Sequence, residues 1–246
     1  MTNWRSFGGA FFMPDICLLR RQEVGMKDMT MCAQRGDLEG LREALAEPGA
    51  RERLNDVDYR GRSPLMVAVQ ANQPEAVAAL LAAGADSEQT DALHDTPLLA
   101  AAALGYGNCL TCLLEHGASA TVLNRFSSTA LMSASERGHA DICRVLLEQT
   151  DVPPDHQNRL GWTALIEAVL LGDGGDAYQQ VVKQLLDHGA DVNLADAEGV
   201  TPLAHARWRK FETLSDMLEA AGGREQGVAH VVSDEGGSAW YYPGGC

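Results

Sequence analysis

The sequence predicts an all-α solenoid of about six helix–turn–helix units, because one short pattern returns at a nearly constant distance along the chain. A Pro-Leu or Ala-Leu pair begins at Pro64, Pro97, Ala130, Ala164 and Pro202, at spacings of 33, 33, 34 and 38 residues. A second pattern, Leu-Leu-x-x-Gly-Ala, follows at a fixed offset and begins at Leu80, Leu113 and Leu185. A period of about 20–50 residues indicates a stack in which each unit packs on its neighbours.

Residues 96–117 show why each repeat is expected to form two helices. Thr96 can cap the first helix by accepting from an early backbone N–H, and Pro97 fits the first helical position, where its missing N–H is harmless. Gly105 is expected to end this helix. The leucines at 110, 113 and 114 have the i, i+3, i+4 spacing of an apolar helix face, and Gly117 favours a left-handed cap for the second helix.

Two motifs together resemble the ankyrin repeat: Thr-Pro-Leu at residues 96–98 and 201–203, and Leu-Leu-x-x-Gly-Ala-Asp at 80–86 and 185–191. The resemblance covers about residues 27–223, roughly four-fifths of the chain. It implies short β-hairpin tips between the units and a concave groove that binds a partner. Gly161-Trp162-Thr163-Ala164, followed by an insertion at residues 173–177, is also similar to a group of small stand-alone bacterial ankyrin proteins.

The expected units differ in regularity. The first lacks Thr-Pro-Leu, which suits a solvent-facing cap. Two tips have His94 and Ser127 where the others have glycine, so a local strain of about 1 kcal/mol is expected there. The expected boundaries are 1–26 for a flexible arm, 27–57 for the cap, 58–90, 91–123, 124–157, 158–195 and 196–223 for the repeats, and 224–246 for a flexible tail that contains Trp240-Tyr241-Tyr242.

The charge balance excludes two classes of partner. The chain has 34 acidic and 19 basic residues and a formal net charge of −15. We therefore expect no nucleic-acid partner and no membrane partner, because phosphate groups attract basic surfaces. No apolar run approaches the length of about 18 residues that a membrane span needs. Cys32, Cys109, Cys112 and Cys143 fall on expected helix-core positions, which favours reduced thiols and a cytoplasmic location.

No residue pattern indicates catalysis, a cofactor or a metal. Cys109-x-x-Cys112 lacks the second Cys or His pair of a structural zinc site, so buried core thiols are favoured over a metal or redox role. Asp173 and Asp176 flank two glycines and supply too few oxygens for a calcium loop. No Ser/His/Asp or Cys/His set stands out, and we expect a protein that is not an enzyme.

The ankyrin resemblance points to the tips and to the last turn of each first helix as partner-binding positions. Ten of the 25 residues at these positions are arginine or aromatic and only three are acidic. Arginine, tryptophan and tyrosine dominate the energetics of protein interfaces. The candidate partner-binding residues are Tyr59, Arg60, Arg62, Leu93, Arg125, Phe126, Arg137, Arg159, Leu160, Trp162, Trp208 and Arg209. Leu104 and Leu171 occupy equivalent helix-end positions.

The expected function is non-catalytic binding of another protein through the concave groove and the tips. The basic and aromatic character of the groove implies a partner with an acidic and apolar epitope. On its own the chain is expected to be monomeric. Two alternatives stay open at this point: a secreted effector that acts on host proteins, and a small-molecule enzyme or enzyme subunit.

Overall fold

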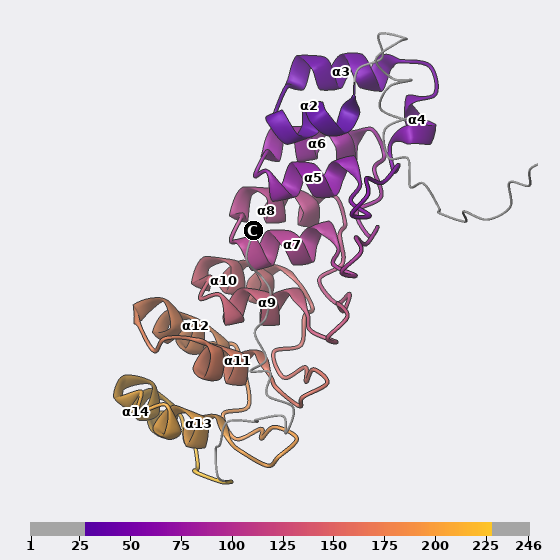
Figure 1. Cartoon of the computed structure of the whole chain (residues 1–246). Coiled ribbons are helices and arrows are strands. Elements are labelled where there is room, and N and C mark those ends of the chain that lie inside the picture. The colour runs from indigo at the N-terminus through magenta and orange to yellow at the C-terminus, as the bar shows by residue number, and fades with distance from the viewer. Residues whose placement is uncertain (1–27, 228–246) are drawn as a thin grey trace, which may run out of the picture.

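The computed structural model describes residues 28–227, which fold into one curved stack of helices (Figure 1). Thirteen helices and no β-strand occur within these residues, so the predicted all-α solenoid is confirmed. The predicted N-terminal arm, residues 1–26, and the tail from residue 228 onward lie outside the described residues. Over residues 28–227, no helix is long and apolar enough to cross a membrane.

Six helix pairs follow one another along the stack, and each pair gives one helix to each of two layers (Figure 1). The first helices are α2 (Met29–Arg35), α5 (Pro64–Gln70), α7 (Pro97–Leu104), α9 (Ala130–Glu136), α11 (Ala164–Leu171) and α13 (Pro202–Trp208). The second helices are α3 (Leu38–Ala46), α6 (Pro74–Ala82), α8 (Gly107–Glu115), α10 (Ala140–Gln149), α12 (Asp176–Asp187) and α14 (Glu212–Ala220). A short helix, α4 (Ala50–Arg53), follows α3 and is not predicted by the repeat pattern. The exact residue borders between units stay a prediction.

A buried hydroxyl group begins five of the first helices. Each of these side chains accepts a hydrogen bond from the backbone N–H three residues on; they are Ser63, Thr96, Thr129, Thr163 and Thr201. A cap of this kind stabilises a helix by about 1 kcal/mol. Thr96 therefore caps α7 as predicted, and Gly105 ends it with a left-handed φ of 74°.

The core is built from one leucine and one alanine at fixed places in the first helices. The leucines are Leu65, Leu98, Leu131, Leu165 and Leu203, and all are buried. The alanines stand three residues further on, at Ala68, Ala101, Ala134, Ala168 and Ala206, and none has accessible surface. Because alanine has no atoms beyond Cβ, neighbouring first helices can pack at about 8–10 Å. From α5 to α13, each first helix contacts the next one.

The chain reverses between units in five tips that project from one side of the stack (Figure 1). The tips are residues 58–62, 91–95, 124–128, 158–162 and 196–200. The predicted β-hairpins are not formed, since the described residues contain no strand. Each tip is closed by two short-range backbone hydrogen bonds, as from Asp58 N–H to the Arg62 carbonyl at 3.0 Å and from Gly61 N–H to the Asp58 carbonyl at 2.9 Å. Two bonds inside five residues make a turn and leave no room for a strand ladder.

An aspartate or asparagine begins every tip and fixes its shape. The Oδ1 atom of each one accepts from the N–H groups two and four residues on, at 2.8–3.1 Å. These residues are Asp58, Asp91, Asn124, Asn158 and Asp196. Short polar side chains form such turns with their own backbone. Neighbouring tips are also joined, because Arg159 N–H donates to the Phe126 carbonyl and Ala197 N–H to the Leu160 carbonyl, each at 3.3 Å.

The two tips without glycine adopt the backbone conformation that glycine would favour. His94 and Ser127 both have a φ of 63°, whereas Gly61 and Gly161 at the equivalent positions have φ of 75° and 73°. The left-handed conformation predicted from the sequence is therefore present at both sites. It disfavours residues that carry a Cβ by about 1–2 kcal/mol.

We predict that His94→Gly stabilises the fold and that Gly161→Ala destabilises it. His94→Gly relieves the left-handed strain, and the gain exceeds the extra freedom of the unfolded chain, for a net increase of about 0.5–1 kcal/mol in the free energy of unfolding. A Cβ at Gly161 would lie 2.5 Å from the Ala197 nitrogen in the next tip, so Gly161→Ala should lose more than about 1 kcal/mol. Urea denaturation measures both. Equal effects of the two changes would show that tip strain does not influence stability.

Candidate functional site

The exposed apolar side chains gather at the tips and at the ends of the first helices. Nine large hydrophobic residues are exposed within residues 28–227, and six of them occupy these positions. The six are Tyr59, Leu93 and Leu160 on the tips and Leu104, Leu171 and Trp208 at the helix ends. Tyr59 is 78% exposed and Leu160 is 51% exposed. We call these six residues, together with Arg60, Arg125 and Arg159, the tip row.

Three arginines of the tip row keep their charge available to a partner. Arg60 and Arg125 are exposed and lie over the rings of their neighbours, 5.4 Å from the Tyr59 centroid and 4.6 Å from the Phe126 centroid. Arg159 is exposed, and its Nε donates to Ser127 Oγ at 3.3 Å. Among the described residues, no carboxylate lies within ion-pair distance of these three guanidinium groups. Cationic groups beside apolar rings suit a partner that is both acidic and apolar.

The other three candidate arginines hold the protein itself together. Arg62 binds Asp58 Oδ2 at 2.7 Å and Gln70 Oε1 at 2.8 Å, which ties the first tip to α5. Arg137 lies 3.4 Å from Glu136 Oε1. Arg209 donates to the Gly172 carbonyl at 2.7 Å and lies over Phe211. These contacts give Arg62, Arg137 and Arg209 structural roles that the sequence alone did not reveal.

The remaining candidates, Phe126 and Trp162, are half-buried. Phe126 is placed beside Arg125 by the ring contact and beside Arg159 by the backbone hydrogen bond. Sequence reasoning missed Val57 and Leu123, which are exposed directly before the first and third tips. The recurring Asp or Asn that begins each tip is the signal that would have located them, since both residues precede it.

A buried carboxyl group lies behind the fourth tip, with the half-buried Glu136 as its acidic neighbour. Glu167 on α11 is 5% exposed, and its Oε1 accepts from Asn158 Nδ2 at 2.9 Å. Burial, with the Glu136 carboxylate as a second cause, raises the pKa of Glu167 well above its ordinary value. Burial also raises the pKa of Glu136, although Arg137 opposes it. The contact from Asn158 to Glu167 anchors the tip to the helix beneath it, just as Asp196 Oδ2 is anchored to His205 Nε2 at 2.7 Å in the next unit.

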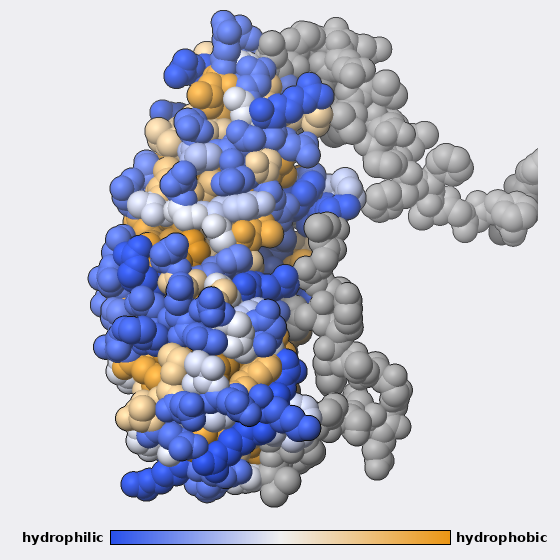
Figure 2. Space-filling model, turned by 90° about the vertical axis from the view of Figure 1, so that its left-hand side faces the viewer, coloured by the Kyte–Doolittle hydropathy of each residue, from blue (hydrophilic) through white to orange (hydrophobic). Residues whose placement is uncertain are grey.

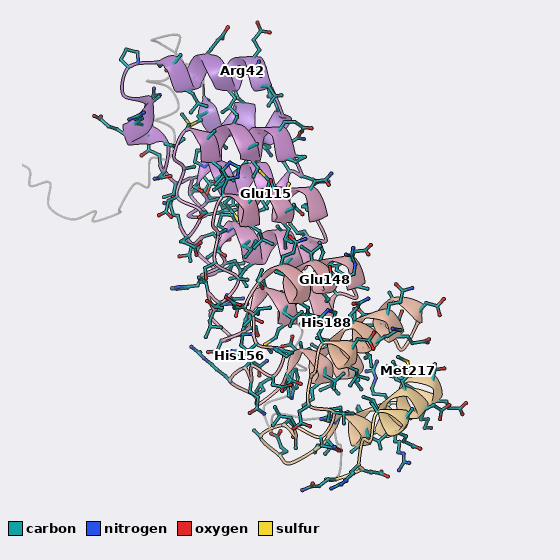
Figure 3. All side chains as sticks on the ribbon, turned by 180° about the vertical axis from the view of Figure 1, so that it is seen from behind. Arg42, Glu115, Glu148, His156, His188 and Met217 are labelled. Atoms are coloured by element: carbon teal, nitrogen blue, oxygen red, sulfur yellow. The ribbon has the colours of Figure 1, made fainter. Side chains whose placement is uncertain are left out.

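The surfaces away from the tips have a different character. The side opposite the tips shows mainly hydrophilic side chains with scattered apolar ones (Figure 2). From behind, Arg42, Glu115, Glu148 and Met217 mark the row of second helices α3, α8, α10 and α14 (Figure 3). The described tips differ from the second helices because they combine exposed arginines with the exposed apolar side chains of Tyr59, Leu93 and Leu160.

The cysteines mostly belong to the core. Cys32, Cys109 and Cys143 are buried, whereas Cys112 is half-buried and only borders the core that the sequence assigned to it. Burial raises the pKa of both Cys109 and Cys143 to about 11, so these thiols stay protonated near neutral pH. Within the described residues, no three His, Cys, Asp or Glu side chains come together in a way that could hold a metal ion.

A family model for three copies of the ankyrin repeat matches residues 29–124 and, in a second alignment, residues 98–196. The chain belongs to the ankyrin repeat family. It is 35% identical over 195 residues to the ankyrin repeat protein YahD of Escherichia coli K12, with 79% of this chain and 96% of that protein covered. A solved ankyrin repeat domain from Acinetobacter baumannii AYE has 41% identity and a TM-score of 0.74, with 80% of this chain and 98% of that one covered. The ankyrin repeat domain of Bcl-3, a member of the IkappaB protein family, has 25% identity and a TM-score of 0.72 over 80% of this chain and 86% of its own.

We predict that Glu167→Gln stabilises this ankyrin repeat protein more at pH 8 than at pH 5. Folded Glu167 keeps its proton to a higher pH than the unfolded chain does, because its pKa is raised from 4.5 by burial. The unfolded state thus binds fewer protons than the folded state as pH rises through this range, and the free energy of unfolding falls. Glutamine removes that loss and can still accept from Asn158 Nδ2. Thermal melts at several pH values measure the stability difference between wild type and Glu167→Gln, and Glu198→Gln on an exposed tip is the control. A pH-independent difference between wild type and Glu167→Gln would contradict the prediction.

Proposed function

We propose that this protein binds a partner protein through the tip row and has no catalytic role. Ankyrin repeats are generally protein–protein interaction modules. The observation that carries the proposal is that exposed apolar side chains occur on the tips and at the ends of the first helices, and that three tip arginines form no ion pair with a described carboxylate. Exposed apolar clusters rimmed by polar groups mark interaction sites on soluble proteins.

The proposed mechanism is binding by tips whose conformation is fixed before the partner arrives. Every tip is held by its own Asp or Asn and by a backbone hydrogen bond to one or more neighbouring tips, and three tips have a side-chain contact to the helix below. Side chains on such a scaffold lose little conformational entropy when a partner binds. Affinity can therefore come from a modest number of anchors, among which Tyr59 and Trp208 are the aromatic groups of the row and Leu160 is its most exposed leucine.

The partner surface should carry carboxylates beside an apolar patch. Arg125 and Arg159 lie on adjacent tips, and Leu93 and Leu160 flank them along the stack. Nucleic acid and anionic membranes are not proposed as partners, because the net charge of −15 opposes them. We further propose that the protein is monomeric when alone and acts in the cytoplasm of a bacterium, as the thiol-rich core and its similarity to bacterial relatives suggest.

We predict that Arg125→Glu with Arg159→Glu abolishes partner capture and leaves the fold intact. Reversing both charges replaces attraction with repulsion. The loss of binding free energy is several kcal/mol if the ion pairs with the partner are desolvated, and under about 1 kcal/mol if they lie at the rim of the interface. Stability should change by less than about 0.5 kcal/mol, because exposed side chains support no core. Pull-down from the native lysate, with circular dichroism melts, measures both quantities.

The matched control is Arg42→Glu with Arg144→Glu. It makes the same change in net charge on the second helices, where both arginines lie on α3 and α10. Partner capture should survive the control change. Equal capture by wild type, tip variant and control would show that the tip row is not the binding surface.

A further inference from the structure

We propose that the chain's own C-terminal segment, residues 233–246, docks on the tip row and occupies it until a partner protein displaces it. The inference uses the same surface as the proposed function and rests on it to that extent. Its occupant is a named segment of this chain. Three observations point to it: where the described chain ends, how far the remaining residues reach, and what they carry.

The described chain ends on the tip side of the stack. Thr201 N–H donates to the Gln226 carbonyl at 3.0 Å, and Gln226 N–H donates back to Thr201 Oγ1 at 3.1 Å. Gly227 lies so close to the fifth tip that a Cβ there would be 2.6 Å from the Gly199 carbonyl oxygen. Although the sequence predicts a flexible tail from residue 224, residues 224–227 are thus bound to the last unit. The last described residues therefore lie beside the fifth tip.

The length of the segment matches the distance to the tip row. Twelve residues, 228–239, lie between Gly227 and Trp240. A flexible Gly- and Ser-containing chain of that length has a root-mean-square span of about 20 Å. Successive units stack at about 8–10 Å, so the fourth and third tips lie about one and two such steps from the fifth. Effective concentration is highest, about 1 mM, when the linker span matches the distance between the sites.

The composition of the segment complements the tip row. Residues 228–246 contain Asp234 and Glu235, the consecutive aromatics Trp240-Tyr241-Tyr242, and no lysine or arginine. The aromatic rings can cover the exposed apolar tips and accept cation–π contacts from Arg125 and Arg159, while the carboxylates can pair with the same arginines. This is the acidic and apolar chemistry that the tip row requires of a partner.

The second helices have a different surface within the described residues. They carry none of the exposed large apolar side chains. Arg144 and Lys183 on α10 and α12 are paired with carboxylates of their own helices, and Figure 3 shows Glu115 and Glu148 on α8 and α10, whose charge repels an acidic segment. Near residue 227, Arg224 is exposed and Arg207 is paired with Glu219 and Glu225, whereas Arg125 and Arg159 on the third and fourth tips are exposed arginines that lie beside exposed apolar side chains. Both the charge and the point of departure of the segment direct it to the tip row.

The test is binding of a fluorescein-labelled synthetic peptide of residues 233–246, made with Cys246→Ser, to full-length proteins. The tail variant carries Trp240→Ser, Tyr241→Ser and Tyr242→Ser, which vacates the tip row. If the peptide binds it with a Kd of about 100 µM, the tethered wild-type segment at about 1 mM fills the site and weakens peptide binding about tenfold. We expect the tail variant to bind the peptide about tenfold more tightly than wild type.

A second pair of proteins locates the site. Adding Arg125→Glu and Leu160→Ser to the tail variant should reduce peptide binding at least tenfold, whereas adding Arg144→Glu should not change it. Circular dichroism melts check that each variant is folded. Equal peptide affinity for wild type and tail variant would overturn the proposal, and so would binding that survives the tip changes. A wild-type dimer that grows with concentration and is lost in the tail variant would overturn it too, because the segment would then dock on a second copy.

The same variants separate this proposal from the proposed function. If the tail variant captures its partner through Arg125 and Arg159 but binds no peptide, segment docking fails and partner binding by the tip row stands. If the peptide binds as expected but partner capture is unchanged by the tip substitutions, the tip row binds only the C-terminal segment and the proposed function fails.

Discussion

The packing of each first helix on the next is the constraint on which the rest of the structure depends. An alanine without accessible surface recurs at the same place in these helices, from Ala68 to Ala206, and a larger side chain there would push neighbouring units apart. The close approach brings the tips near enough for backbone hydrogen bonds between them, as from Arg159 to Phe126. Core packing and surface geometry are therefore linked: the spacing that buries leucine in the interior also sets the spacing of arginine and apolar groups on the surface.

Polar groups are buried behind the tips, where a loosely packed structure could not satisfy their hydrogen bonds. Glu167 is buried beside Glu136 and is held by Asn158, and Asp196 is held by His205 in the next unit. Burying a carboxyl group is unfavourable unless it is protonated or hydrogen-bonded, and these contacts supply the hydrogen bonds. Their effect is to fix the tips on the first helices. The arginines fall into two groups. Arg62, Arg137 and Arg209 contact other residues of the stack, whereas Arg60, Arg125 and Arg159 are exposed on the tips and form no ion pair with a described carboxylate.

The fold could be predicted from the sequence because its causes are local and repeated. Thr96, Pro97, Gly105 and the leucine spacing each specify a helix start, a helix end or a buried face, and the period repeats the specification in every unit. The tips were predicted less well, since β-hairpins were expected where Asp and Asn side chains form turns. The roles of the six arginines could not be read from the sequence at all. Whether a guanidinium meets Asp58, Glu136 or the Gly172 carbonyl depends on contacts between residues that only the folded stack brings together.

Hydrogen exchange on the partner complex tests the central claim most directly, that the tip row is a preformed binding surface. The tail variant, in which Trp240, Tyr241 and Tyr242 are serine, serves as the free reference, so that any docking of the C-terminal segment does not enter the comparison. The account predicts that partner binding slows exchange in residues 91–95, 124–128 and 158–162 and leaves α8, α10 and α12 unchanged. Slowed exchange confined to the second helices, or spread evenly over the stack, would contradict it.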